Sequence, residues 1–233
     1  MAIEPVAGPP RPLAAAASPE VASPARPPID VERLAFFSDA VFAIALTILA
    51  LDLRLPALPP IGTSEQLVDA IVAMWPQLYS FTLSFVVITL FWNGHYRTFS
   101  FLRGIDAVFL LLNLVLLFLI VLLPFPTSVL GEHGDLLAAT VFYGCVTGVT
   151  ALVSTALFSY AWRYGLLGPQ VTPAIGHFVT RRALLVPVVL FGAIPLALLS
   201  PYLTQVVWLG LLSGQFLFYR GAPPGARAAA REA

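Results

Sequence analysis

Charged residues are scarce in this chain, and lysine is missing altogether. Only 10% of the 233 residues are charged, and all 12 basic residues are arginines. Soluble domains carry roughly 25% charged residues. A chain that is 59% hydrophobic with so little charge therefore indicates a membrane protein with several spans. Its net charge of zero argues against a nucleic-acid partner.

Cysteine and recognisable catalytic motifs are also nearly absent. Cys145 is the single cysteine, so an intrachain disulfide is excluded. The sequence has no glycine-rich phosphate loop, no nucleophile elbow and no intramembrane carboxylate pair suited to a proton relay. His95 has no cysteine, aspartate or glutamate at ligand spacing, which argues against a metal site. We therefore expect neither an enzyme nor a cofactor.

The two ends of the chain differ in composition from its middle. Alanine, proline and serine dominate residues 1–29, and alanine and arginine dominate residues 221–233, so both stretches are predicted to be disordered tails. A secretory signal over Leu13–Ala17 is rejected because that stretch is too short and too weakly hydrophobic. Residues 30–220 form the predicted membrane domain.

Hydropathy predicts an all-α fold with six transmembrane helices in this domain. A bilayer span requires about 20 apolar residues. Six segments of roughly this length cover Leu34–Leu53, Val68–Trp92, Ile105–Leu130, Leu136–Trp162, Ala183–Ser200 and Tyr202–Tyr219. Thr63 and Gln66 have the spacing of a capping box, which predicts a helix start near Glu65. Pro124 and Pro126 are expected to break the end of the third segment.

The arginines give an orientation. They precede the first segment, lie between the second and third and between the fourth and fifth, and follow the sixth, at Arg33, Arg97, Arg103, Arg163, Arg181, Arg182, Arg220, Arg227 and Arg231. The opposite loops contain only Arg54. Because positively charged loops stay in the cytoplasm, both termini are predicted to be cytoplasmic.

The first apolar segment carries a continuous stripe. No charge interrupts residues 40–51, and Ile44, Ile48 and Leu51 share one face of the predicted helix, with Thr47 beside them. Taken alone, such a stripe is most simply interpreted as packing against lipid or neighbouring helices.

Polar residues stand at the start of this same helix. Arg33, Ser38 and Asp39 precede the stripe, and an ionisable group costs about 2.5–3.5 kcal/mol at the bilayer centre. On a helical wheel Asp39 points about 140° away from Ile44. We interpret these three residues as anchors that fix the rotation of the helix.

A second polar cluster, Asn93, His95 and Arg97, closes the second segment. It belongs either to an interfacial belt of aromatic residues and arginines or to a hydrogen-bonded network with the anchors of the first helix. The network is favoured because both groups lie at the same end of the membrane, where lipid cannot satisfy them.

Three motifs in order resemble the transmembrane protein 175 family of potassium channels. They are Arg33-x-x-x-Phe37-Ser38-Asp39, the block Phe91-Trp92 with His95-Tyr96-Arg97, and Leu122-Leu123-Pro124-Phe125-Pro126-Thr127. The similarity covers about residues 32–135. Tyr96 departs from the pattern, since many relatives have a histidine there.

The resemblance implies a bacterial-type channel, a homotetramer in the plasma membrane with one six-helix unit per chain. It implies that the first helix lines the pore and that K⁺ is the permeant ion. Ile44 would form the main constriction, Ile48 and Leu51 further rings, and Thr47 the hydroxyl that favours K⁺ over Na⁺. The implied structural network consists of Arg33, Ser38, Asp39, Trp92, Asn93 and His95.

The expected function is thus a potassium-preferring cation channel with an apolar gate that closes by dewetting. This agrees with the absence of the carbonyl-filter motif Thr-Val-Gly-Tyr-Gly. A secondary transporter is the alternative, which would need broken helices and a polar site at the midplane. Pro187 and Pro195 interrupt the fifth segment, but few charged residues face them. A pH-linked role of His95 stays open. A membrane enzyme or assembly protein is a third class, and the lack of a catalytic constellation makes the enzyme the weakest option.

Overall fold

The structure, a computed structural model, describes residues 30–54 and 62–218. The predicted tails lie outside the described residues. The described residues form helices joined by short turns, with one isolated antiparallel bridge between Leu102 and Leu167. The helices are α1 (Val31–Leu51), α2 (Ser64–Ala73), α3 (Trp75–Ser100), α4 (Ala107–Leu122), α5 (Pro124–His133), α6 (Leu137–Arg163), α7 (Pro173–Gly192), the 3-10 helix η1 (Ile194–Leu198) and α8 (Pro201–Phe218).

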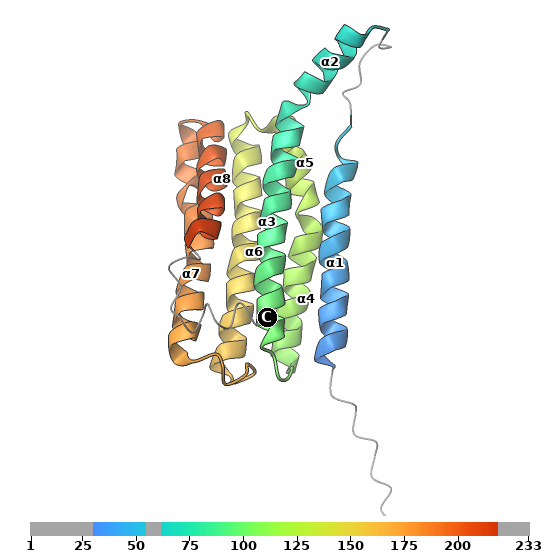
Figure 1. Cartoon of the computed structure of the whole chain (residues 1–233). Coiled ribbons are helices and arrows are strands. Elements are labelled where there is room, and N and C mark those ends of the chain that lie inside the picture. Colours follow the sequence, from blue (N-terminus) through green and yellow to red (C-terminus); the bar gives the residue numbers. More distant parts are fainter. Residues whose placement is uncertain (1–29, 55–61, 219–233) are drawn as a thin grey trace, which may run out of the picture.

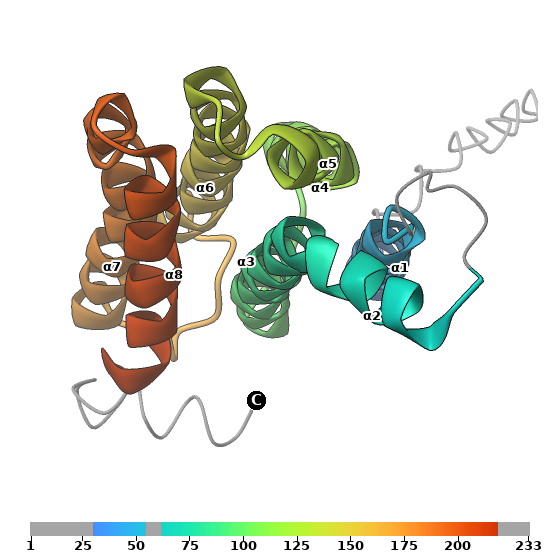
Figure 2. The ribbon, with the colours of Figure 1, turned by 90° about the horizontal axis from the view of Figure 1, so that it is seen from above.

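The long helices stand side by side in one bundle (Figure 1). Seen from above, α1 forms one edge, α3 and the α4–α5 column come next, then α6, with α7 and α8 at the opposite edge (Figure 2). Helix α1 packs against α3 and α4 through a buried face of Leu34, Phe42, Ala45 and Leu49. Its other face is left uncovered in the single chain.

The predicted second span is wrong as one continuous helix. Helices α2 and α3 meet at an angle of 46°, and the bend lies at Met74, whose N–H bonds back to the carbonyls of Ile71 and Val72. Pro76 is the cause, because it has no N–H to donate to Val72 and its ring crowds that carbonyl.

The predicted capping box is confirmed at the start of α2. The Gln66 N–H donates to the Thr63 hydroxyl at 3.3 Å, and the Gln66 side chain accepts a hydrogen bond from the Thr63 N–H. The break near the end of the third segment is confirmed as well. Helix α4 ends at Leu122 and α5 begins at Pro124.

The predicted fifth segment begins too late. Helix α7 starts at Pro173, where the Thr172 hydroxyl accepts a hydrogen bond from the Ile175 N–H. Arg181 and Arg182, expected in a loop, therefore lie on the helix. The charges of these two arginines lower the local hydropathy, so hydropathy places the start of the segment after the first turns of α7.

Four helical stretches in the described part are long and apolar enough to cross a membrane: Val31–Leu51, Ala107–His133, Leu137–Arg163 and Pro173–Leu198. They become five if α2 and α3 count as one bent span. The last predicted segment coincides with α8. Six spans and the position of the termini stay predictions.

Contacts between two turns tie the bundle together at its lower end in Figure 1. The Arg103 N–H donates to the Leu166 carbonyl and the Gly168 N–H donates to the Phe101 carbonyl, both at 2.8 Å. Asp106 caps α4 by accepting from the Phe109 N–H at 2.7 Å, and it also accepts from the Tyr160 hydroxyl at 2.7 Å. The bond from Phe109, with the Tyr160 bond adding to it, holds the pKa of Asp106 below its usual value.

Gly131 sets how closely α5 crosses α3. A Cβ at this position would lie 2.6 Å from the Ser80 hydroxyl oxygen and 3.3 Å from the Gln77 Cα. We expect Gly131→Ala to lower the thermal stability in detergent, by about 1–3 kcal/mol, because the two helices must separate. Gly210→Ala is the control, since no atom lies within 4 Å of its added Cβ. An equal melting temperature for Gly131→Ala and the wild type would contradict this account.

Candidate functional site

The apolar stripe of α1 lies on the uncovered face of the edge helix. The side chains of Ile44, Ile48 and Leu51 are 56%, 36% and 65% exposed. Figure 2 shows α1 at the rim of the bundle, with its neighbours on one side only. An apolar face of this length on an edge helix is available to lipid or to a further copy of the chain.

Thr47 shares the exposed face of α1 and bonds to its own helix. Its hydroxyl donates to the Ile44 carbonyl at 2.8 Å. Since a hydroxyl has a single hydrogen, this bond leaves the oxygen lone pairs as the remaining polar function. Thr47 therefore presents an acceptor, the kind of group that a cation requires.

At the lower end of the bundle, a direct hydrogen bond joins the first half of α1 to the second half of α3. The indole Nε1–H of Trp92 donates to Asp39 Oδ1 at 2.9 Å. The predicted partnership between the first and second segments is thus present in this pair.

Ser38 and His95 are joined through a residue that sequence reasoning missed. The amide nitrogen of Asn113 on α4 donates to Ser38 Oγ at 3.1 Å, and its carbonyl oxygen lies 2.8 Å from His95 Nε2. Since this oxygen can only accept, His95 carries its proton on Nε2. All three side chains are buried, with at most 2% exposed. Asn113 is the only amide in the apolar run of α4, and that isolation was the available signal.

Aromatic rings enclose the histidine. The ring of His95 stacks on Phe99 at a centroid distance of 4.2 Å and lies 5.4 Å from the ring of Phe42. Ser38 additionally donates to the Leu34 carbonyl at 2.9 Å. Helices α1, α3 and α4 are therefore fixed to one another by a small polar core inside an apolar shell.

Two members of the predicted network lie apart from it. Arg33 and Asn93 are exposed, and neither side chain forms a hydrogen bond or an ion pair with another described residue of this chain. Of the other predicted members, Asp39 is hydrogen-bonded to Trp92, and Ser38 is joined to His95 through Asn113.

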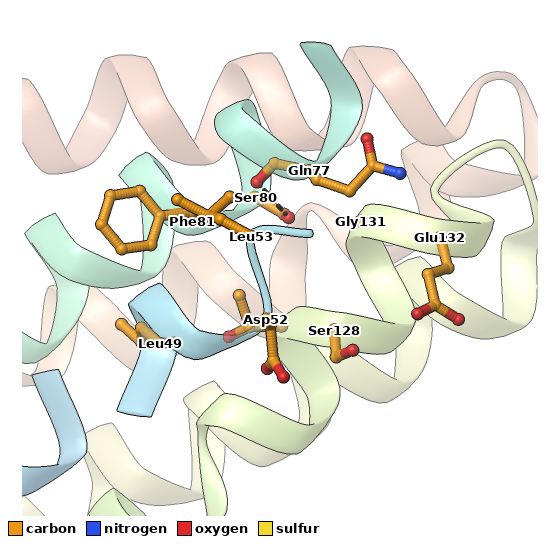
Figure 3. Close-up of a pocket in the computed structure, with 10 residues that line it drawn as sticks. Leu49, Asp52, Leu53, Gln77, Ser80, Phe81, Ser128, Gly131 and Glu132 are labelled. Atoms are coloured by element: carbon orange, nitrogen blue, oxygen red, sulfur yellow. Dashed lines mark hydrogen bonds between the residues drawn. The ribbon is translucent and has the colours of Figure 1, made fainter. Parts of the chain in front are cut away.

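A pocket opens at the upper end of the bundle (Figure 3). The ends of α1, α3 and α5 line it with Leu49, Asp52, Leu53, Gln77, Ser80, Phe81, Thr127, Ser128, Gly131 and Glu132. Figure 3 shows that the carboxylates of Asp52 and Glu132 do not point toward one another. The described residues contain no group of three or more potential metal ligands, here or elsewhere.

Taken together, the described residues form a helical membrane protein with an uncovered apolar face on its edge helix α1. Comparisons with known proteins agree with this class. Residues 33–124 match the family model described as endosomal/lysosomal potassium channel TMEM175. A solved structure, described as a lysosomal potassium-selective channel TMEM175 homolog from Chamaesiphon minutus, superimposes with a TM-score of 0.70 at 28% identity. The match covers 80% of this chain and 96% of that chain.

Two curated relatives extend the comparison. A potassium channel of Streptomyces collinus is 36% identical over 145 residues, which is 60% of this chain and 68% of the relative. A mouse protein named endosomal/lysosomal proton channel TMEM175 is 28% identical over 155 residues, 66% of this chain but only 30% of the mouse protein. The chain belongs to the TMEM175 family, which is a family of ion channels and not of enzymes.

Asn113 offers a test of the polar core. Asn113→Leu keeps the size of the side chain but leaves Ser38 and His95 without their shared partner. We expect a loss of stability of about 1–3 kcal/mol, measured by thermal unfolding in detergent. Thr82→Leu is the control and should have little effect, because Thr82 is exposed on α3 and its hydroxyl bonds only to the Leu78 carbonyl of the same helix. Equal melting curves for the two variants would count against the polar core as a determinant of stability.

Proposed function

We propose that this protein is a potassium-preferring cation channel formed by four copies of the chain, with α1 of each copy lining the pore. The observation that supports this proposal most directly is the exposed apolar stripe of Ile44, Ile48 and Leu51 on the edge helix. A stripe buried inside the bundle would be unavailable to a pore. Membership in a channel family, together with relatives named as potassium channels, supports the choice of ion.

Ile44 forms the gate in this proposal. A ring of four isoleucines gives a narrow apolar bore in which a hydrated cation is unfavourable, so the pore closes by dewetting. Ile48 and Leu51 form further rings one and two turns toward the α2 end. A small rotation or dilation of α1 is then sufficient to open the pore.

Thr47 tunes the choice of ion. It lies one turn from Ile44, and its oxygen lone pairs are left to accept because its hydrogen is donated to the helix. A ring of hydroxyl oxygens can replace part of the water around a cation, and K⁺ gives up its water at lower cost than Na⁺ does. This contribution adds to the effect of bore width.

The polar core holds the pore helix in register. Ser38 and Asp39 are bonded from the side opposite the stripe, through Asn113 and Trp92. Arg33 and Asn93, exposed in the single chain, complete the network between neighbouring copies. The membrane is a bacterial plasma membrane, with both termini in the cytoplasm and the α2 end outside, as the arginine distribution indicates.

The decisive experiment is electrical recording from purified protein in bilayers. Reversal potentials in mixed K⁺ and Na⁺, and under a pH gradient, distinguish a potassium channel from a proton channel. The mouse relative is named as a proton channel. Flux at rates above those of an alternating-access cycle excludes the secondary transporter. Absence of any cation current from a tetramer of verified mass would overturn the proposal.

Ile44→Asn should raise the K⁺ conductance about tenfold or more, equivalent to removing about 1.4 kcal/mol from the barrier, and should weaken selectivity. The asparagine amide hydrogen-bonds to water, so water enters the apolar constriction and the closed pore becomes hydrated. Single-channel recording measures both effects. Val188→Asn on α7, a similarly exposed aliphatic position, is the control. Wild-type currents in the Ile44 variant would remove Ile44 as the gate.

Thr47→Val removes the hydroxyl while preserving shape. We expect the permeability ratio of K⁺ to Na⁺ to fall by about two- to tenfold, at most about 1.4 kcal/mol. The control is Thr82→Val, because Thr82 is also exposed and makes the same kind of backbone bond, to the Leu78 carbonyl at 2.7 Å. A ratio that falls equally in both variants would assign the effect to helix packing instead.

A further inference from the structure

Helix α2 and the first residue of α3 carry an apolar row that the described part of the chain leaves uncovered. The side chains of this row are between 40% and 69% exposed, and they are Leu67, Val68, Ile71, Val72 and Trp75. Only Ala70 of α2 is buried. Contiguous exposed apolar surface of this kind indicates an interaction site.

The bend at Met74 aims α2 toward the edge formed by α1. Figure 1 shows α2 rising above the bundle, and Figure 2 shows it running from the top of α3 past α1. Helix α2 therefore lies over the same edge of the molecule as α1. A partner that covers the stripe can reach the row as well.

Lipid is a poor occupant for this row. Helices that bind at the membrane surface lie in its plane and are rich in lysine and arginine on their polar face. Helix α2 has no basic residue, and its polar side carries Glu65 and Asp69. Its angle of 46° to α3 also inclines it well out of the membrane plane if α3 crosses the membrane upright.

Charge complementarity favours a second copy of the chain. Arg54 follows the end of α1, is exposed, and donates through Nε to the Leu51 carbonyl at 3.1 Å. It forms no ion pair with a described carboxylate of its own chain, and neither Glu65 nor Asp69 forms one with a described cation. Residues 55–61, which connect α1 to α2, contain no charge. Arg54 and the acidic side of α2 are thus complementary groups that stay apart within one copy.

We propose that α2 docks on the neighbouring copy of this chain, with its apolar row against the upper end of the neighbour's α1 and Glu65 and Asp69 beside the neighbour's Arg54. This inference rests on the proposed multimeric channel and adds an intersubunit clamp around its outer mouth. The bend at Met74, caused by Pro76, sets the angle of the clamp.

Cross-linking between two differently tagged chains tests the contact. Both chains carry Cys145→Ala; one adds Arg54→Cys and the other Asp69→Cys. After co-expression and mild oxidation, we expect a reducible dimer that carries both tags. Because each chain has one cysteine, no bond within a chain can produce it. Pairing Arg54→Cys with Glu132→Cys, an exposed carboxylate on α5, is the control and should give at most a tenth of that product.

A charge exchange gives an independent readout. Arg54→Asp and Asp69→Arg should each lower the thermal stability of the assembly, and the double variant should restore it. An intact tetramer that conducts K⁺ but yields no two-tag dimer above the control would overturn the docking and leave the proposed function standing. Monomeric wild-type protein would count against the proposed function itself. Quenching of a fluorescent label on Val72→Cys by brominated lipid would show that lipid covers the row, and would also overturn the docking.

Discussion

The arrangement of α1 depends on the side chain of Asn113. A buried amide in an apolar helix must find partners, because lipid supplies none. Asn113 finds Ser38 on α1 and His95 on α3, at 3.1 Å and 2.8 Å. Since each of these three groups satisfies another, rotating α1 would leave buried polar atoms without partners. The rotation of α1 is therefore set from its covered side, and the exposed stripe follows from it.

The most polar motif of the chain therefore lies on the covered side of α1, apart from the apolar stripe. Ser38 and Asp39 lie against α3 and α4, whereas Ile44, Ile48 and Leu51 face outward. The proposed apolar pore needs a helix whose rotation is fixed by polar groups elsewhere, and the hydrogen bonds of Ser38 and Asp39 supply this for α1. The opposite edge of the bundle is held differently, with the fully buried Trp208 on α8 donating to the Leu190 carbonyl of α7 at 3.3 Å.

Much of the fold could be predicted because its signals are local. Hydropathy located the helical segments, the Thr63–Gln66 spacing located the start of α2, and Pro124 located the break between α4 and α5. The start of α7 was missed because Arg181 and Arg182 masked its apolar character. The bend between α2 and α3 was missed because hydropathy is continuous through Met74, and a proline in the first turn of a helix is common without a bend. The role of Asn113 in the polar core was missed because no neighbouring residue in the sequence indicates that its partner, Ser38, lies 75 residues away.

By itself, the sequence determined the class of the protein, the family and the face of α1 that carries the isoleucines, since composition, motif order and helical periodicity are properties of the linear chain. Only the tertiary structure decided which polar residues meet, that Arg33 and Asn93 stay outside the polar core of one chain, and that α2 turns away to expose an apolar row. These outcomes depend on distances between helices far apart in sequence. The physical reason is that hydrogen bonds and close packing act over a few ångströms, whereas the sequence records only neighbours along the chain.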